Sequence, residues 1–169
     1  MTADITRAEF ASVSVRLYEL TTDTTALPAE FNPFADTSDI EVMKAYNIGI
    51  ITGVSATEFS PDTLLNREQA ATMLTGVFKK TTFADWTVAT DGNFTLPYEK
   101  PAPFADDGKI SPWARDSVYF MAANGIINSV GDNKFAPRNT TAEEQSTGYA
   151  NATGEQALLI AVRMLENLK

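Results

Sequence analysis

The sequence contains no cysteine and no histidine. The absence of cysteine excludes disulfides, catalytic thiols and thiolate metal sites, and the absence of histidine excludes imidazole ligands and Ser-His hydrolysis. Long apolar runs are missing too, since no stretch reaches the roughly 18–20 apolar residues of a membrane span. No charged and then apolar leader precedes the first residues, so we expect a soluble chain without membrane insertion.

Positive charge is also scarce, with 13 lysines and arginines against 22 aspartates and glutamates and a formal net charge of −9. This balance argues against general attraction to nucleic acid or to an anionic membrane, so any anionic ligand must be captured locally. The 169 residues, 44% of them hydrophobic, suffice for one domain with a real core and are too few for two large ones. We therefore expect a single domain over residues 1–169.

What the sequence does have is one helix-start pattern in three places. Each place pairs a capping residue with a Glu or Gln three positions later, so that the two side chains satisfy each other's backbone N–H groups. The three capping boxes are Thr6 with Glu9 in DITRAEF (4–10), Asn66 with Gln69 in LNREQA (65–70), and Thr153 with Gln156 in ATGEQA (152–157). Three helices of one kind are therefore predicted.

An arginine stands at the first helical position of two of these starts, as Arg7 and Arg67. The positive end of the helix dipole disfavours a cation there by roughly a few tenths of a kcal/mol. A surface arginine that tolerates this small cost is one explanation. The other is a compact anion site, because the guanidinium and the free helix N–H groups point donors at one place. The third start has Gly154 where an arginine would belong.

The chain also contains an internal repeat. Its shared skeleton is Pro-Phe-Ala-Asp, a helix, Gly-Ile-Ile, a loop with Phe-x-Pro, and then the capped helix. The landmarks are Pro33, Phe34, Asp36, Gly49, Phe59, Pro61 and Arg67 in one copy, and Pro103, Phe104, Asp106, Gly125, Phe135, Pro137 and Gly154 in the next. At the front of the chain only the last part of the pattern is present, from Asp4 to about Leu20.

The second complete copy predicts a clear amphipathic helix. Ser111-Pro112 is expected to start this helix and Gly125 to stop it. The apolar stripe between them consists of Trp113, Val118, Phe120, Met121 and Ala122. The aspartates of the repeat, Asp36 and Asp106, are expected to cap or brace the turn before their own helices, because Asp is a common helix-start residue.

Three further segments have their own patterns. The run LLIAVRML at 158–165 is apolar nearly all round, which predicts the most buried helix and suits a central bundle. Asp91-Gly92, between Val- and Phe-containing runs of the segment 79–102, favours a short hairpin. Residues 138–151 are polar and are expected to form an exposed loop.

Together these segments resemble the S-layer homology (SLH) repeat, which reads roughly Phe-x-Asp, Trp-Ala, Gly-Ile-Ile-x-Gly, Phe-x-Pro and Thr-Arg-Ala-Glu. The resemblance is carried by ITRAEF, FSPDTLLNREQA and FADDGKISPWARDSVYFMAANGII. It implies a mainly α fold, namely a pseudo-threefold helical module with a central three-helix bundle and short loop or hairpin elements. The implied lobes are residues 1–24 (second half of a repeat), 33–80 (a repeat) and 103–169 (a repeat with the polar insertion at 138–151), with 81–102 as a connecting segment.

The resemblance also implies a function. Modules of this family anchor bacterial surface proteins non-covalently to secondary cell-wall polysaccharide, often through a pyruvylated sugar held in grooves between lobes. For this chain it implies an extracellular location at the cell wall, association with other surface-protein domains, no catalytic residues, no cofactor and no metal. The implied ligand contacts are Thr6, Arg7 and Glu9 in one groove, Asn66, Arg67 and Gln69 in another, and Trp113 as a sugar-stacking face.

Departures from the pattern leave alternatives open. Gly154 removes the cation from a third groove, the repeat at 33–80 has no tryptophan, and Trp113 can instead bury its ring in the core. A scaffold that kept the fold, lost sugar binding and mediates protein–protein contact fits the first two departures. An enzyme needs a pair of carboxylates that nothing in the sequence singles out. The acidic clusters at 105–107 and 141–144 lack the spacing of a calcium-binding loop.

Overall fold

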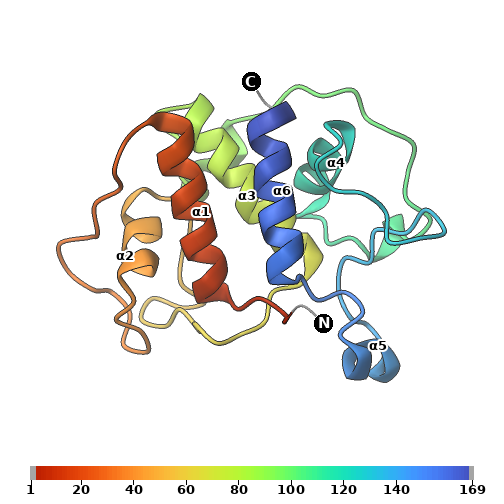
Figure 1. Ribbon diagram of the computed structural model, residues 1–169, viewed down its shortest axis with the longest axis horizontal. Coiled ribbons are helices and arrows are strands. Elements are labelled where there is room, and N and C mark those ends of the chain that lie inside the picture. Colours follow the sequence, from red (N-terminus) through yellow and green to blue (C-terminus); the bar gives the residue numbers. More distant parts are fainter. Residues whose placement is uncertain (1–2, 168–169) are drawn as a thin grey trace. The chain divides into compact units, whose positions relative to one another are not determined.

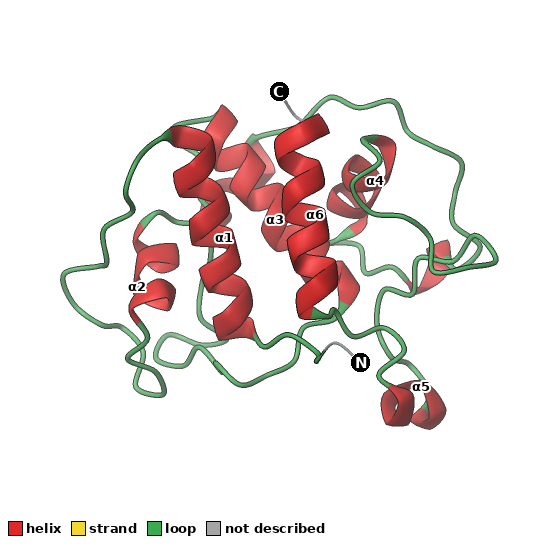
Figure 2. Cartoon of the chain, viewed as in Figure 1, coloured by secondary structure: helices red, strands yellow, loops and turns green. Residues whose placement is uncertain are grey.

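The computed structural model describes residues 3–167 and is mainly helical, as the sequence predicts (Figure 1). Its α-helices are α1 (Arg7–Thr22), α2 (Ile40–Asn47), α3 (Arg67–Thr82), α4 (Arg115–Ala123), α5 (Ala142–Thr147) and α6 (Gly154–Asn167), and its 3₁₀ helices are η1 (Val88–Asn93) and η2 (Asp107–Lys109). Between residues 3 and 167 there is no extended strand, and loops join the helices (Figure 2). None of the helices described is long and apolar enough to cross a membrane.

The chain forms two compact units. Unit 1 consists of Met1–Ile5, Leu64–Thr75 and Leu96–Lys169, and unit 2 consists of Thr6–Thr63 and Gly76–Thr95. Helix α3 begins in unit 1 and ends in unit 2, so neither unit is one continuous stretch of chain. Each unit contains one copy of the pattern that runs from Pro-Phe-Ala-Asp to Phe-x-Pro.

The predicted capping boxes are present at all three helix starts. At α1 the Glu9 N–H donates to Thr6 Oγ1 at 3.2 Å, and the Thr6 N–H donates to the Glu9 carboxylate at 2.9 Å. The same exchange caps the other two helices, between Asn66 and Gln69 at α3 and between Thr153 and Gln156 at α6. These helix starts are confirmed, because a capping box satisfies its donors with residues only three positions apart.

Unit 2 is built around the rings of its repeat. Helix α2 packs against α1. The centroid of the Phe34 ring lies 5.3 Å from that of Tyr46 in α2 and 5.4 Å from that of Phe59 in the Phe-x-Pro loop. Phe10 of α1 and Phe59 are fully buried. Ring contacts among repeat residues therefore hold the loop in the core of this unit.

The predicted hairpin at Asp91-Gly92 is wrong, because Val88–Asn93 form η1 instead. Asp91 Oδ1 accepts hydrogen bonds from Lys79 Nζ at 2.6 Å and from the indole N–H of Trp86 at 2.8 Å. The Trp86 side chain is buried, so its indole donor needs a partner inside the protein. These contacts, which depend on tertiary structure, override the local turn preference of Asp-Gly.

Unit 1 repeats the aromatic arrangement of unit 2. The Phe104 ring centroid lies 5.5 Å from that of Phe135 in the Phe-x-Pro loop and 5.6 Å from that of Tyr119 in α4. Helix α4 buries the run Val118–Met121, and the two isoleucines of Gly-Ile-Ile are buried as well. The predicted apolar stripe is confirmed at Val118, Phe120 and Met121 but not at Trp113, which is exposed, and the helix begins at Arg115 rather than at Ser111-Pro112.

The prediction that residues 158–165 form the most buried helix is wrong. The buried residues of α6 recur every three or four positions, at Ala157, Ile160 and Met164. Between them, Leu158 and Val162 are 60% and 49% exposed. Apolar side chains all round a helix permit burial on any face but do not require it on every face.

The expectation that 138–151 is simply an exposed loop is also wrong, because the segment contains α5. The Glu144 N–H donates to Thr141 Oγ1 and the Thr141 N–H donates to the Glu144 carboxylate, both at 3.1 Å, which makes another capping box. Gly148 ends the helix in the left-handed conformation, with φ 62°. Thr-x-x-Glu at 141–144 is the local signal for this helix.

Candidate functional site

In unit 1, Arg67 holds the Phe-x-Pro loop. Its Nε donates to the Phe135 carbonyl at 2.8 Å, and its Nη2 donates to the Asn128 carbonyl at 2.9 Å. The guanidinium lies over the Phe135 ring, 5.1 Å from the ring centroid, and the residue is only 7% exposed. Charge-assisted hydrogen bonds and a cation–π contact therefore tie the start of α3 to this loop.

Arg7 makes the same set of contacts in unit 2. Its Nε donates to the Phe59 carbonyl at 2.9 Å and its Nη2 to the Thr52 carbonyl at 3.3 Å, with the guanidinium 4.7 Å from the centroid of the Phe59 ring. Arg7 is partly exposed, whereas Arg67 is buried. We call this arrangement, an arginine at the first helical position bound to the Phe-x-Pro loop, the arginine clamp.

The aspartate of Pro-Phe-Ala-Asp binds each clamped loop through its backbone N–H groups. Asp36 accepts from Phe59 at 2.9 Å and from Ser60 at 2.7 Å, and Asp106 accepts from Phe135 and Ala136, both at 2.8 Å. The expectation that these aspartates cap or brace the turn before their own helices is therefore wrong. Each loop has its carbonyl groups bound by an arginine and its N–H groups bound by an aspartate.

The two carboxylates support an unusual backbone. Ser60 and Ala136 have φ of 59° and 54°, in the left-handed region, although neither is glycine. This conformation costs an L-residue about 1 kcal/mol or more, and charge-assisted hydrogen bonds to the neighbouring aspartate offset that cost. Hydrogen bonds from the backbone N–H groups lower the pKa of the Asp36 carboxyl, and the one from Phe59 has the largest effect.

Both clamp arginines are partly removed from water. Desolvation lowers the guanidinium pKa of Arg7, while the charge of Asp36 acts in the opposite direction. Desolvation also lowers the guanidinium pKa of Arg67, and Tyr149 and Asp106 oppose that change. Both side chains stay charged, since a guanidinium titrates far above neutral pH. Arg67 is therefore a buried cation and Arg7 a partly buried one, and both donate to loop carbonyl oxygens.

The structure places the residues predicted to contact ligand at two helix starts. Thr6, Arg7 and Glu9 lie at the start of α1 in unit 2, and Asn66, Arg67 and Gln69 lie at the start of α3 in unit 1. In each group the cap residue and its partner bind each other, while the arginine binds the loop. The polar side chains that the sequence singles out thus have defined structural partners.

Trp113, by contrast, presents an open ring. It is 58% exposed and lies just before α4, so the interpretation of Trp113 as a core residue is wrong. Gly154, at the start of α6, has no described atom within 4 Å of the place where a Cβ would lie. The third helix start therefore has the capping box without an arginine clamp.

A cavity of about 580 Å³ lies next to the clamped loop of unit 1. The loop contributes Ala136 and Pro137 to the walls, and Asp106, which binds the loop, also lines the cavity. The remaining charged and aromatic side chains of the lining are Lys109, Lys134, Arg138, Glu143, Glu144 and Tyr149. A concave space of this size with a few polar groups and an aromatic ring suits a small polar ligand.

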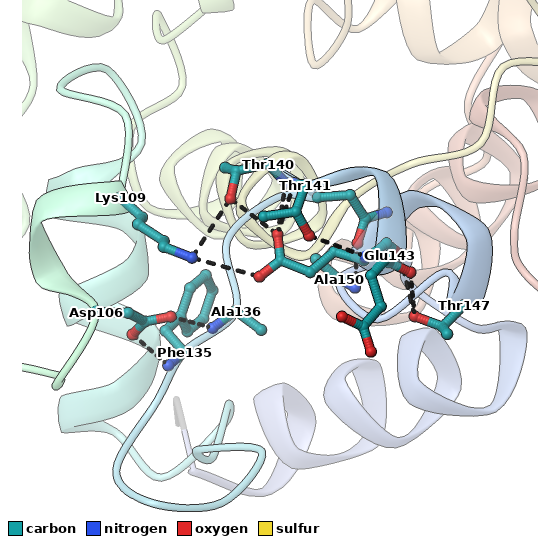
Figure 3. A network of polar contacts seen from close by, with 11 residues as sticks. Asp106, Lys109, Phe135, Ala136, Thr140, Thr141, Glu143, Thr147 and Ala150 are labelled. Atoms are coloured by element: carbon teal, nitrogen blue, oxygen red, sulfur yellow. Dashed lines mark hydrogen bonds and ion pairs between the residues drawn. The ribbon is translucent and has the colours of Figure 1, made fainter.

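Lys109 and Glu144 both line this cavity and form an ion pair with each other. Figure 3 shows the Lys109 ammonium directed at Thr140. Lys109 Nζ donates to Thr140 Oγ1 and to Glu144 Oε1, both at 3.3 Å. Glu144 also accepts from the N–H of Thr140 at 2.7 Å and from its hydroxyl at 2.8 Å. These contacts lower the pKa of the Glu144 carboxyl to about 2, and the hydrogen bond from the Thr140 N–H has the largest effect. Helix α5 is therefore tied to the wall that carries Lys109.

A buried carboxylate positions another cation of the lining. Glu68 is 1% exposed and accepts from both the N–H and the hydroxyl of Ser111 at 2.9 Å. Arg138 Nη1 donates to the Ser111 hydroxyl at 2.9 Å and lies 4.0 Å from Glu68 Oε1. Glu68 directly follows Arg67, so the start of α3 places both the clamp and Arg138.

Sequence reasoning missed most of this lining. Two signals were available in the sequence. The capping pattern Thr-x-x-Glu at 141–144 indicates the start of α5, and Glu68 places a carboxylate where the first capped helix has the apolar Ala8. The long-range contacts of Asp106 with the Phe-x-Pro loop had no local signal. Within residues 3–167, no group of three or more acidic side chains is placed to hold a metal ion.

Comparison with protein families matches residues 33–71 and 103–141 to the S-layer homology domain. Among curated proteins, an endoglucanase of Bacillus sp. (strain KSM-635) is 30% identical over 145 residues, and an amylopullulanase of Thermoanaerobacterium thermosulfurigenes is 27% identical over 164 residues. A surface-layer 125 kDa protein of Lysinibacillus sphaericus is 35% identical over 79 residues.

The chain spans only a small part of each of these relatives. The matched segments make up 86%, 96% and 47% of this chain, but only 14% of the endoglucanase, 8% of the amylopullulanase and 5% of the surface-layer protein. The activities in the names of the two enzymes thus belong to much longer proteins. Each relative matches this chain over 79 to 164 residues, and the rest of each relative lies outside the match.

Proposed function

Because this chain belongs to the S-layer homology family, we propose that it is a non-catalytic module that binds a secondary cell-wall polysaccharide of a bacterium. In this function it lies outside the cell and holds an attached surface-protein domain at the wall. The relatives support the proposal, since a surface-layer protein and two enzymes with different names each match a part of this chain.

The observation that carries the proposal is the cavity of unit 1. Its walls include the motif residues of the repeat, Asp106, Ala136 and Pro137, at the loop that Arg67 clamps. The buried Arg67 and the carboxylate of Asp106 both bind this loop and keep it in a single conformation, as a binding surface requires. A rigid, polar and concave surface of this kind suits the binding of a polysaccharide.

We assign the predicted contact residues two kinds of role. The partly exposed Arg7, with Thr6 and Glu9 beside it, meets an anionic substituent such as a pyruvate ketal through the edge of its guanidinium. At α3 the contacts fall to Asn66 and Gln69, while Arg67 acts as a positioning residue for the loop. Trp113 offers an exposed ring on which a sugar can stack.

A scaffold function remains the second candidate, and the arginine clamp favours it in one respect. The clamp gives both Arg7 and Arg67 a structural reason to be present, so the two arginines alone do not separate sugar binding from a scaffold. Gly154 also fits a scaffold, because the third helix start has no cation to bind an anionic sugar. The two candidates differ in whether the isolated chain binds cell-wall polymer.

A sacculus pull-down tests the proposal. The purified chain is mixed with Lysinibacillus sphaericus sacculi, either intact or after acid extraction of the secondary polymer. We expect binding to intact sacculi and its loss after extraction. Folded chain that binds neither preparation, or both equally, refutes polysaccharide anchoring.

Two substitutions locate the contacts in the same assay. Trp113→Ala and Arg7→Gln are expected to weaken binding, since each removes an exposed or partly exposed group. Arg16→Gln is the matched control, because the Arg16 side chain is 73% exposed and is paired only with Glu19 on its own helix among the residues described. Circular dichroism of each variant separates lost contacts from lost folding.

A further inference from the structure

We propose that the cavity of unit 1 binds a sugar unit that carries both a carboxylate and an ammonium group, and that segment 138–151 supplies the residues that select it. This inference rests on the proposed function and names the ligand chemistry of one site. Some charged groups of the cavity still have unused donors or acceptors.

Two cations of the lining have unused donors. Lys134 Nζ has no hydrogen bond or ion pair within the described part of the chain, and the residue is exposed. Arg138 Nη1 donates to the Ser111 hydroxyl and pairs with Glu68 Oε1 at 4.0 Å, and the side chain is 48% exposed. The rest of its guanidinium donors can bind a carboxylate, for which its planar geometry is suited.

The third cation, Lys109, is already engaged. It binds both the Thr140 hydroxyl and Glu144, and Figure 3 shows it directed at Thr140. Lys109 therefore fixes the position of α5 rather than offering charge to a ligand.

One carboxylate of the lining is also uncommitted. Asp106 accepts two backbone N–H groups, and Glu144 accepts from Thr140, Thr141 and Lys109. The carboxylate of Glu143, by contrast, has no partner between residues 3 and 167, and Figure 3 shows it pointing away from the dashed contacts. Glu143 is exposed and lines the cavity, so its carboxylate is available to a cationic donor.

In the part of the chain that the structure describes, the cavity therefore offers free donors on two cations, Lys134 and Arg138, and one free carboxylate, that of Glu143. A purely anionic sugar would pair with Lys134 and Arg138 but bring its charge near Glu143. A purely cationic sugar would pair with Glu143 but face two cations. A zwitterionic amino sugar satisfies all three groups, which is the charge pattern that electrostatic complementarity selects.

Neutral contacts complete the site. Tyr149 is 46% exposed and offers an aromatic face, and the Thr147 hydroxyl, which donates to the Glu143 carbonyl at 3.0 Å, keeps its acceptor capacity for a sugar hydroxyl. Both residues line the cavity and both come from segment 138–151. The cavity volume of about 580 Å³ suits one or two sugar units.

The selecting residues stand on a fixed element. The Thr141–Glu144 capping box starts α5, and the Asn139 side chain accepts from the Ala150 N–H at 2.8 Å where the segment returns. With the Lys109–Glu144 contact, these bonds hold both ends of the segment in place. Glu143 and Thr147 are therefore preorganised, which reduces the entropy lost on binding.

Four commercially available sugars test the charge pattern. Muramic acid has a carboxylate and an amine, N-acetylmuramic acid has only the carboxylate, glucosamine has only the amine, and N-acetylglucosamine has neither charge. Each is titrated into the isotopically labelled full chain at about pH 6, where amines are protonated and carboxylates ionised, and amide NMR shifts give the affinity. We expect muramic acid to bind at least about five-fold more tightly than each of the other three, with shifts at Glu143, Lys134 and Arg138.

Charge-removing variants assign each preference. Glu143→Gln is expected to abolish the advantage of muramic acid over N-acetylmuramic acid, and Arg138→Gln its advantage over glucosamine. Glu155→Gln and Arg16→Gln are the matched controls, since both residues are exposed and neither lines the cavity. The controls are expected to leave the ranking of the four sugars unchanged.

Other results overturn the inference. Equal affinity for all four sugars, tightest binding of N-acetylmuramic acid, or no shift at the cavity with any sugar would each do so. The sacculus assay keeps this failure separate from failure of the proposed function. Wild-type chain that binds intact sacculi but shows no preference for muramic acid leaves anchoring in place and refutes only the zwitterionic ligand.

Discussion

The guanidinium of Arg67 lies over the ring of Phe135 and donates to the carbonyl of that same residue at 2.8 Å. This contact explains a residue that the helix dipole disfavours. The dipole cost of a cation at the first helical position is about 0.3–1 kcal/mol, which is less than the contribution of charge-assisted hydrogen bonds at a buried site. The same contact between Arg7 and Phe59 shows that this use of arginine belongs to the repeat.

Replacing Arg67 with methionine is expected to lower the free energy of unfolding by about 3 kcal/mol. The substitution keeps much of the packing on Phe135 but leaves the Phe135 and Asn128 carbonyls without their donor. Arg67→Lys is expected to recover only part of the loss, because a single ammonium lacks the geometry that serves two separate acceptors. Urea denaturation followed by circular dichroism measures the difference.

Arg16→Met is the matched control for this experiment. The Arg16 side chain is 73% exposed, and its substitution is expected to change the free energy of unfolding by less than about 0.5 kcal/mol. If Arg67→Met unfolds at the same urea concentration as Arg16→Met, the clamp makes no contribution to stability and its role must be sought in binding.

The helix starts could be predicted from the sequence because their determinants are local. A capping box involves residues three positions apart, and Thr6 with Glu9 makes the contacts that the pattern implies. The role of Asp106 could not be predicted in the same way, because its acceptors serve backbone N–H groups 29 and 30 residues later. A carboxylate before a helix looks like a cap whether or not a distant loop needs it.

Burial and turn type were predicted less well, for related reasons. The apolar run of α6 identifies a helix but not its buried face, so Leu158 and Val162 are exposed against expectation. Asp91 is part of a turn sequence, yet the donors of Lys79 and Trp86 decide its position. The cavity was missed because its lining comes from several segments between residues 105 and 149, and only the fold brings them together.

Gly76→Ala is expected to destabilise the chain even though alanine is the better helix former. A Cβ at residue 76 would lie 2.8 Å from Cη2 of Trp86, whose ring is 1% exposed and has its indole N–H bound to Asp91. The overpacking costs about 1–3 kcal/mol, against a gain of at most about 1 kcal/mol in helix propensity. Thermal unfolding of the variant measures the net loss, and an unchanged or higher midpoint would show that Trp86 moves freely.

Gly154→Ala is expected to have the opposite effect. This glycine stands at the first position of α6, and a Cβ there would meet no described atom within 4 Å. Alanine reduces the conformational freedom of the unfolded chain, so the free energy of unfolding should rise by about 0.4–1 kcal/mol. The measurement is the same thermal scan as for Gly76→Ala, and a loss of stability at residue 154 would contradict the open space around it.

The stability of α5 is expected to depend on pH through Glu144. Its pKa in the folded chain is about 2, below the ordinary value of 4.5, because N–H, hydroxyl and ammonium donors favour the ionised carboxylate. A group with a lowered folded pKa contributes stability that is fully present above its unfolded pKa and is lost as pH falls through the folded value. The contribution of Glu144 should therefore be complete above about pH 4.5 and disappear as pH falls toward about 2.

An NMR titration of the Glu144 side-chain carboxyl, with the α5 amides followed in parallel, measures this dependence. The carboxyl is expected to titrate near pH 2, and the α5 amides should shift toward disordered values over the same range. Glu144→Gln should remove this response, because the amide can accept from Thr140 but carries no charge for Lys109. Glu143→Gln is the control on the same helix, since Glu143 has no side-chain partner among the residues described, and it should leave the α5 response at low pH in place. A Glu144 carboxyl that titrates at its ordinary value would mean that α5 is not held by Lys109 and Thr140 in solution, and the preorganised wall of the cavity would then lose its basis.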